Sequence, residues 1–253
     1  MAPLRTNAVG VLAVLALTAS AALAATKIPE SWGTCKRSDP KFDECLRGAI
    51  QRAMTALEKG SSEFGIGPLD PFKVSQLSLE KGNGGALSMD MTLSEAEIIG
   101  FKNARVESVQ TDMNKFKIVA NMRTDKLDLN SLYKVTGRVL LIPINGNGKT
   151  TIKMQKPLLR LSMQGGLKKG ADGNDHLHIE STTFEIIPEK ANFRFVNPAH
   201  AVQADLLSRV VSENDKVIMT ELQPAISQAF NKRLLEITNR IFDKVAFEDV
   251  FPQ

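Results

Sequence analysis

Roughly the last fifty residues carry one long amphipathic pattern, and this pattern limits the possible folds more than any other feature of the chain. Its apolar residues are spaced by three or four, as on one face of an α-helix. We expect a helix from about Lys216 to Val245, roughly 45 Å long at 1.5 Å per residue. Pro224 would lie near its beginning, where a missing backbone donor costs little. The stripe consists of Leu222, Ile226, Phe230, Leu234, Ile237, Ile241 and Val245. A stripe of this length requires an equally long apolar surface to cover it.

The middle of the chain supplies such a surface, because it has the two-residue period of β-strands. In ALSMDMTL (86–93) and KFKIVANMR (115–123), apolar residues alternate with polar ones. Similar segments recur as YKVTGRVLLIPI, TTIKM, PLLRLSM, DHLHIES, TTFEIIP and ANFRFVN. We therefore predict an α+β fold in which a curved, meandering antiparallel sheet with one covered face wraps the long C-terminal helix. Periodicity leaves open whether the two surfaces close into a solid core or leave a tunnel between them.

A shorter helical pattern precedes the strands. DPKFDECLRGAIQRAMTALEKG (39–60) has apolar residues at three- and four-residue spacing, and Gly60 ends it. Cys35 and Cys45 are the only cysteines of the chain. In an oxidising compartment we expect a local disulfide between them. The alternative is a metal site, but two thiolates without His or Cys nearby would leave a tetrahedral site half built.

The first 24 residues have the features of a secretory signal peptide. Arg5 is followed by a short apolar run that ends in Ala22-Leu23-Ala24, a small-residue cleavage site. A membrane anchor is the weaker alternative, since the run is shorter than the roughly 20 residues needed to span a bilayer. Residues 25–253 would then form a single secreted domain, with no integral membrane association.

The charge of the chain gives no sign of a nucleic-acid partner. Removal of Arg5 with the leader lowers the formal net charge from +4 to +3. This small excess is scattered and lacks the aromatic-studded basic stretches that bind nucleic acids. We expect the charge to serve solubility, and we expect a monomer.

The segment IPINGNGKT (142–150) ends like a phosphate-binding loop. Such a loop needs a glycine five residues before its Gly-Lys-Thr, where this chain has Pro143, which has no N–H to donate. Asn and Gly tolerate positive φ, so a proline before Asn-Gly-Asn-Gly favours a tight turn between two strands. We therefore predict a hairpin here, with no nucleotide cofactor.

The three histidines do not form a recognised catalytic pattern. His176 and His178 are expected on the wet face of one strand, and His200 precedes the last helix. No Gly-x-Ser-x-Gly elbow accompanies them, as an esterase would require. A metal site at the first two would need Asp172, Asp175 or Glu180 at no recognised spacing. We expect neither enzymatic activity nor a metal.

A third possibility is a protein that lies on membranes through its long helix. Surface-seeking helices are mainly basic opposite their apolar side. The polar face of this helix mixes acids and bases: Glu221, Gln228, Lys232, Arg233, Glu236, Arg240 and Asp243. The mixture favours a helix packed inside a soluble fold.

The ordered set of features resembles the takeout and juvenile hormone binding protein family of insects, over nearly the whole mature chain. The resemblance rests on the early cysteine pair, on GPLDP (67–71), IGF (99–101) and YKVTGRVLLIPINGNG, and on the tail segments ELQPAISQAF and NRIFDKVAFEDVFP. The block before the tail departs from the family, since it is shortened to VQADLLSRVVSENDKV and lacks Trp. The far end of a tunnel would therefore be shaped differently.

The resemblance implies a tubular lipid-binding fold, with a hydrophobic small molecule carried in an internal tunnel and secretion into haemolymph or another extracellular fluid. The ligand class would be a terpenoid hormone, a fatty acid or another lipid. Methionines suit such a lining because flexible thioethers adapt to irregular shapes, although they equally well fill a core. Tyr133 could orient a polar head or be structural, and Trp32 could close the mouth or pack the N-terminal arm. The expected lining is Met89, Met91, Leu93, Phe116, Ile118, Met122, Tyr133, Val139, Leu141, Met154, Leu161, Met163, Leu222, Ile226, Phe230 and Leu234.

Overall fold

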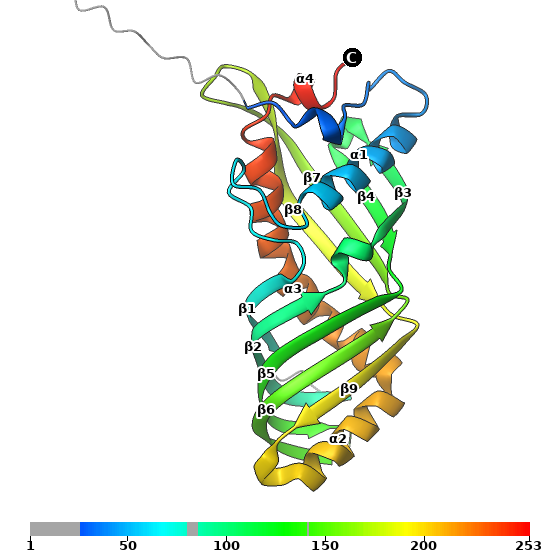
Figure 1. The fold of residues 1–253 in the computed structure, drawn as a ribbon, viewed down its shortest axis with the longest axis vertical. Coiled ribbons are helices and arrows are strands. Elements are labelled where there is room, and N and C mark those ends of the chain that lie inside the picture. The colour runs from blue at the N-terminus through cyan, green and yellow to red at the C-terminus, as the bar shows by residue number, and fades with distance from the viewer. Residues whose placement is uncertain (1–25, 80–85, 141) are drawn as a thin grey trace, which may run out of the picture.

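The computed structural model describes residues 26–79, 86–140 and 142–253, and the expected signal peptide lies outside these ranges. The described chain forms two antiparallel sheets, arranged one above the other along an elongated molecule (Figure 1). The five-stranded sheet has the order β1 (Phe72–Leu79), β2 (Leu87–Ile99), β5 (Lys126–Val139), β6 (Ile142–Gln155) and β9 (Lys190–Val196). The four-stranded sheet has the order β3 (Arg105–Asp112), β4 (Lys117–Arg123), β7 (Leu158–Lys169) and β8 (Asp175–Ile187).

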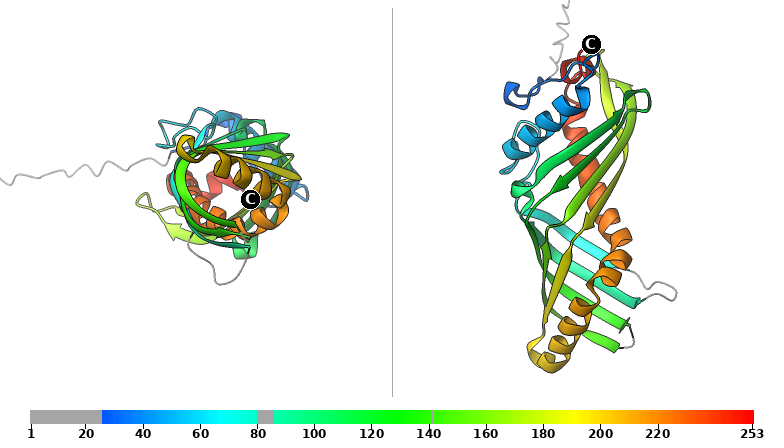
Figure 2. Two further views of the ribbon diagram at one scale, coloured as in Figure 1. Left: turned by 90° about the horizontal axis from the view of Figure 1, so that it is seen from below. Right: turned by 90° about the vertical axis from the view of Figure 1, so that its right-hand side faces the viewer.

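Within the described ranges, four α-helices accompany the sheets. They are α1 (Phe42–Ala56), α2 (Ala201–Glu213), α3 (Asp215–Phe242) and the short α4 (Phe247–Val250). The five-stranded sheet curves around α2 and the beginning of α3, and the four-stranded sheet covers the rest of α3 and packs against α1 (Figures 1 and 2). The predicted α+β class, with strongly curved antiparallel strands around a long C-terminal helix and a shorter N-terminal helix, is confirmed. The strands are divided between two sheets instead of forming one.

The long helix begins at Asp215, as expected, and ends at Phe242, three residues before the expected Val245. A separate helix, α2, immediately precedes α3, and the apolar Ala204, Leu207 and Val211 of α2 are buried at helical spacing. Pro224 was expected near the start of the long helix, but it lies inside α3, nine residues after Asp215. A proline there cannot donate to the carbonyl of Thr220. The packing of α3 between the sheets therefore outweighs the local cost of the proline.

Polar side chains of the two helices complete the open edges of both sheets. Ser208 and Ser212 of α2 accept hydrogen bonds from the backbone N–H groups of Phe195 and Phe193 at 2.8 Å. On the other sheet, Asn239 of α3 both accepts from and donates to the backbone of Ile179, at 2.8 Å in each direction. Exposed strand edges invite aggregation, so these contacts protect the sheets as well as fixing the helices.

The NGNG segment is the clearest difference between sequence and structure. The predicted hairpin turn is wrong, because residues 145–148 lie within the continuous strand β6, paired with β5. The chain reverses instead just before Ile142. A Cβ at Gly148 would come within 2.1 Å of the carbonyl oxygen of Val196 on β9. Gly148 therefore allows β6 and β9 to approach each other closely, whereas from the sequence it was expected to allow a positive φ in a turn.

The N-terminal arm is fixed at one end of the molecule. Cys35 and Cys45 form the predicted disulfide, with their Cα atoms 5.8 Å apart. Trp32 is buried and packs on Phe64, with ring centroids 5.5 Å apart. The backbone N–H of Arg37 donates to the carbonyl of Pro252 at 2.8 Å. Both ends of the described chain thus lie together, beside α1 and α4 (Figure 1).

Candidate functional site

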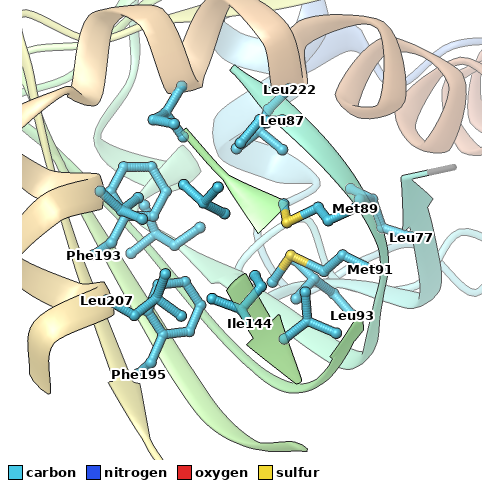
Figure 3. A pocket seen from close by; sticks show the side chains of 15 residues that line it. Leu77, Leu87, Met89, Met91, Leu93, Ile144, Phe193, Phe195, Leu207 and Leu222 are labelled. Atoms are coloured by element: carbon cyan, nitrogen blue, oxygen red, sulfur yellow. The ribbon is translucent and has the colours of Figure 1, made fainter. Parts of the chain in front are cut away.

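An internal cavity of about 40 Å³ lies between the five-stranded sheet and the helices α2 and α3 (Figure 3). All of the side chains that line it are apolar. They come from five strands and two helices: Leu77, Leu87, Met89, Met91, Leu93, Val135, Val139, Ile144, Ile152, Phe193, Phe195, Leu207, Val211, Ile218 and Leu222. The cavity is thus a site for apolar atoms, and its wall contains no charged group.

The strand β2 supplies the flexible part of the wall. Its inward-facing residues are Leu87, Met89, Met91 and Leu93, at the two-residue spacing of a strand, and all four are buried. Figure 3 shows Met89 and Met91 side by side, opposite Phe193 and Phe195 of β9. Methionine is unbranched and adapts to irregular shapes. This side of the wall can therefore change its shape at low cost.

A surface groove adjoins the cavity at the end of the molecule where α2 begins. The groove has a volume of about 390 Å³ and is formed by β5, β6 and α2, together with Asn197 and His200. Val135, Ile144 and Leu207 line both the groove and the cavity. These three side chains are therefore the partition between the cavity and the surface.

Tyr133 lies at the same end of the molecule. It is buried, lines the groove and packs edge-on against Phe195, with ring centroids 5.2 Å apart. Burial raises the pKa of the Tyr133 hydroxyl above its ordinary value. The phenol is therefore protonated at neutral pH and can donate a hydrogen bond.

Four phenylalanines close the interior where the two sheets meet. Phe230 of α3 contacts Phe72, Phe101 and Phe184, with centroid distances of 5.2, 6.1 and 4.7 Å. We call these four residues the aromatic cluster. Phe72 begins β1 and Phe184 belongs to β8, so the cluster joins the two sheets. The cavity is thus confined to the half of the molecule formed by the five-stranded sheet.

The expected lining residues fall into two groups. Met89, Met91, Leu93, Val139 and Leu222 line the cavity. The others lie outside the cavity. Tyr133 lies in the groove, Phe230 in the aromatic cluster, and Met154 is buried on β6, while Ile226 and Leu234 are half-buried on α3. The four-stranded sheet holds the buried Ile118, Met122 and Met163 and the half-buried Leu161; Phe116 is half-buried against Phe247, and Leu141 lies outside the described residues.

Several lining residues were not expected from the sequence. Phe193 and Phe195 alternate with polar residues in ANFRFVN, and Leu207 and Val211 of α2 are four apart. Both patterns were visible in the sequence. Their placement opposite β2 depends on the pairing of β6 with β9, which joins segments far apart in the chain.

His176 is held by hydrogen bonds within the fold. His176 was expected on the wet face of its strand, but it is buried, with its ring nitrogens 3.0 Å from Asp172 Oδ1 and 3.2 Å from the carbonyl oxygen of Phe242. Burial lowers the pKa of His176, but these hydrogen bonds outweigh it and raise the pKa above its ordinary value. The hydrogen bond from Asn174, and to a lesser extent that from His176, lowers the pKa of Asp172 to about 2. The two acceptors thus favour the protonated form of His176.

Two further properties of the described residues bear on function. They contain no group of three or more His, Cys, Asp or Glu side chains that could hold a metal ion. Among the helices in the described ranges, none is both long and apolar enough to cross a membrane.

Comparisons with known proteins agree with this architecture. Residues 11–252 match the sequence profile of the family described as haemolymph juvenile hormone binding protein. The chain is 22% identical over 226 residues to the circadian clock-controlled protein daywake of Drosophila yakuba, covering 85% of this chain and 86% of the relative. It is 21% identical over 231 residues to daywake of Drosophila melanogaster, covering 88% of each.

Among solved structures, the crystal structure of Takeout 1 from Epiphyas postvittana has the same fold. It superposes with a TM-score of 0.76 at 21% identity, over 87% of this chain and 99% of that one. The match of the family profile to nearly the whole sequence is decisive. This chain belongs to the takeout and juvenile hormone binding protein family.

Proposed function

We propose that this protein is a secreted carrier that binds a hydrophobic small molecule in the cavity between the five-stranded sheet and α2 and α3. The observation that carries the proposal is the wholly apolar wall of this cavity. The family is described as binding juvenile hormone in haemolymph, which supports a carrier function. The ligand would be a terpenoid, a fatty acid or another lipid, and binding it requires no catalytic group.

The cavity must widen to hold such a molecule. Its volume of about 40 Å³ is well below the roughly 300–1,000 Å³ of ligand sites. A twelve-carbon chain contributes about 10 kcal/mol of transfer free energy, at about 0.8 kcal/mol per CH₂. This amount can offset the rearrangement of the methionines of β2 and still leave an affinity near the micromolar range.

The ligand would reach the cavity through the adjoining groove. Val135, Ile144 and Leu207 separate the two spaces, and Ile144 is only partly buried. Displacement of these side chains would join the groove to the cavity. The aromatic cluster blocks the other direction.

The remaining proposals concern the state of the mature protein. We propose that residues 1–24 are removed on secretion and that residues 25–253 act as one monomeric domain, without nucleic acid, metal or catalytic activity. The membrane-surface alternative is less favoured because apolar residues of α3, among them Ile218, Phe230 and Ile237, are buried inside the fold.

Native mass spectrometry of the protein purified from its own source tests the carrier function. We expect a co-purified apolar molecule at one copy per chain and, after its removal, saturable binding of an apolar fluorescent dye. A delipidated protein that binds no apolar dye would refute the carrier function. Co-sedimentation with anionic vesicles in place of dye binding would favour the membrane-surface alternative.

A further inference from the structure

Two buried hydroxyl groups of the described residues have no hydrogen-bond partner. They belong to Ser131 on β5 and Thr150 on β6, whose residues are 8% and 2% exposed. Ser131 and Thr150 lie directly opposite each other in the antiparallel ladder, so both side chains point to the same face of the sheet. This face is the inner one, since the neighbouring Tyr133 and Ile152 on it are also buried. Buried polar groups are usually paired, so two unpaired neighbours require an explanation.

The two hydroxyl groups lie next to residues that line the apolar cavity, although neither Ser131 nor Thr150 is itself a lining residue. On the inner face of β6, Thr150 lies between Ile144 and Ile152, which both line the cavity. Thr150 is also paired with Phe195 of β9, a third lining residue. Between Ile144 and Thr150 the inward positions of β6 are glycines, at 146 and 148. The ring of Tyr133, which is paired with Gly148, lies 3.1 Å from the place of a Cβ at Gly148, so a ligand oxygen would reach the hydroxyl groups beside this ring.

We propose that the Ser131 and Thr150 hydroxyl groups bind the polar group of the carried ligand. This inference rests on the proposed carrier function and specifies the chemical class of its ligand. A hydroxyl group both donates and accepts hydrogen bonds, so the pair suits an alcohol, ketone or ester oxygen. The side chains that line the cavity include no Lys, Arg or His, and a buried carboxylate without a cation is strongly disfavoured. The ligand is therefore a long apolar molecule with a neutral oxygen group.

A double variant, Ser131→Ala with Thr150→Val, removes both hydroxyl groups and leaves side chains similar in shape to the original ones. The probes are dodecanol, dodecane and dodecanoate, and each dissociation constant is measured by displacement of an apolar fluorescent dye. In the unchanged protein, dodecanol should bind more tightly than dodecane or dodecanoate. In the double variant, dodecanol should bind about threefold to tenfold more weakly, the loss expected for one or two hydrogen bonds, while dodecane binding should not change.

A matched control is Thr136→Val on the same strand. Thr136 is exposed on the outer face and donates to Asn145 Oδ1 at 3.1 Å, so this variant should bind all three probes like the unchanged protein. The ligand-free double variant should be at least as stable as the unchanged protein, because it loses two unpaired buried polar groups.

The outcomes separate this inference from the carrier function. If the ratio of dodecanol to dodecane affinity is the same in the unchanged protein and the double variant, the hydroxyl pair does not bind the ligand. A double variant that is less stable without ligand would assign the pair a structural role and overturn the inference. Tighter binding of dodecanoate than of dodecanol would overturn the neutral ligand class. If the unchanged protein binds neither the dye nor dodecane, the carrier function itself fails.

Discussion

The ring of Phe230 on α3 stacks on the ring of Phe72 on β1, with centroids 5.2 Å apart and planes inclined by 5°. Phe101 and Phe184 complete this cluster. It separates the half of the molecule that contains the cavity from the half formed by the four-stranded sheet. The interior is consequently a small cavity at one end and a packed aromatic core at the junction of the sheets.

Replacement of Phe230 by Ala should destabilise the protein by about 3–5 kcal/mol, as expected when a buried Phe leaves a cavity. Phe230 is 3% exposed and contacts three other rings. Urea denaturation gives the difference in the free energy of unfolding. Val202→Ala is a suitable control, since Val202 is 80% exposed and should change stability by less than about 0.5 kcal/mol. A loss below about 1 kcal/mol in Phe230→Ala would show that the cluster is not a rigid core.

Asn239→Ala should cost about 2–4 kcal/mol, because it leaves both the N–H and the C=O of the buried Ile179 without their partner. Asn239→Asp keeps an acceptor and loses the donor, so its cost should be intermediate. Chemical denaturation measures both values. Gln228→Ala, at an exposed position of the same helix, is the control. Equal stability of Asn239→Ala and the control would contradict the role of α3 in completing the edge of β8.

The contact between His176 and Asp172 should make stability depend on pH. Because the pKa of His176 is raised in the folded protein, its contribution is complete below its ordinary pKa of 6.5 and is lost as pH rises through the raised value. The pKa of Asp172 is lowered from 3.8 to about 2, so its contribution is complete above pH 3.8 and is lost as pH falls toward 2. Both contributions are present together between about pH 4 and 6.5.

The variant His176→Gln tests this dependence. The free energy of unfolding of the unchanged protein should exceed that of the variant by the largest margin between about pH 4 and 6.5, and the margin should fall on either side. Denaturant titrations at a series of pH values provide the measurement, and Asp172→Asn should remove the same dependence. A margin that does not vary with pH would show that the pair does not titrate on folding.

Ile144→Trp should slow the exchange of an apolar dye, because a larger side chain would obstruct the partition between the groove and the cavity. Both association and dissociation rates should fall at least threefold, with a smaller change in their ratio. Stopped-flow fluorescence measures both rates. Leu132→Trp, on β5 at a 38% exposed position, is the control. Rates for Ile144→Trp that equal those of this control would show that ligands use another path.

The sequence predicted those parts of the fold that depend on local periodicity. The alternation of Met89, Met91 and Leu93 in β2 and the long stripe of α3 both appear in the structure. Each needs only the geometry of one strand or one helix, which the spacing of apolar residues reveals. The same periodicity could not show that the strands are divided between two sheets, since strand pairing joins distant segments.

The errors have a common physical origin in contacts between distant segments. Gly148 favours a turn by its residue type, but the close approach of Val196 on β9 explains it. His176 has the spacing of an outward-facing residue in its own segment, yet the end of α3 covers it. The unpaired hydroxyl groups of Ser131 and Thr150 likewise become visible only when β5, β6 and β9 are assembled.

The most direct test of the carrier function is photolabelling with an alkyl diazirine, followed by mass spectrometry of the labelled peptides. We expect the label on the cavity wall, in the β2 segment with Met89 and Met91 and in the β9 segment with Phe193 and Phe195. Excess dodecanol should compete with the label. Labelling confined to the exposed Val202 and Leu206, or to the four-stranded sheet around Met163, would contradict binding of the ligand in the cavity.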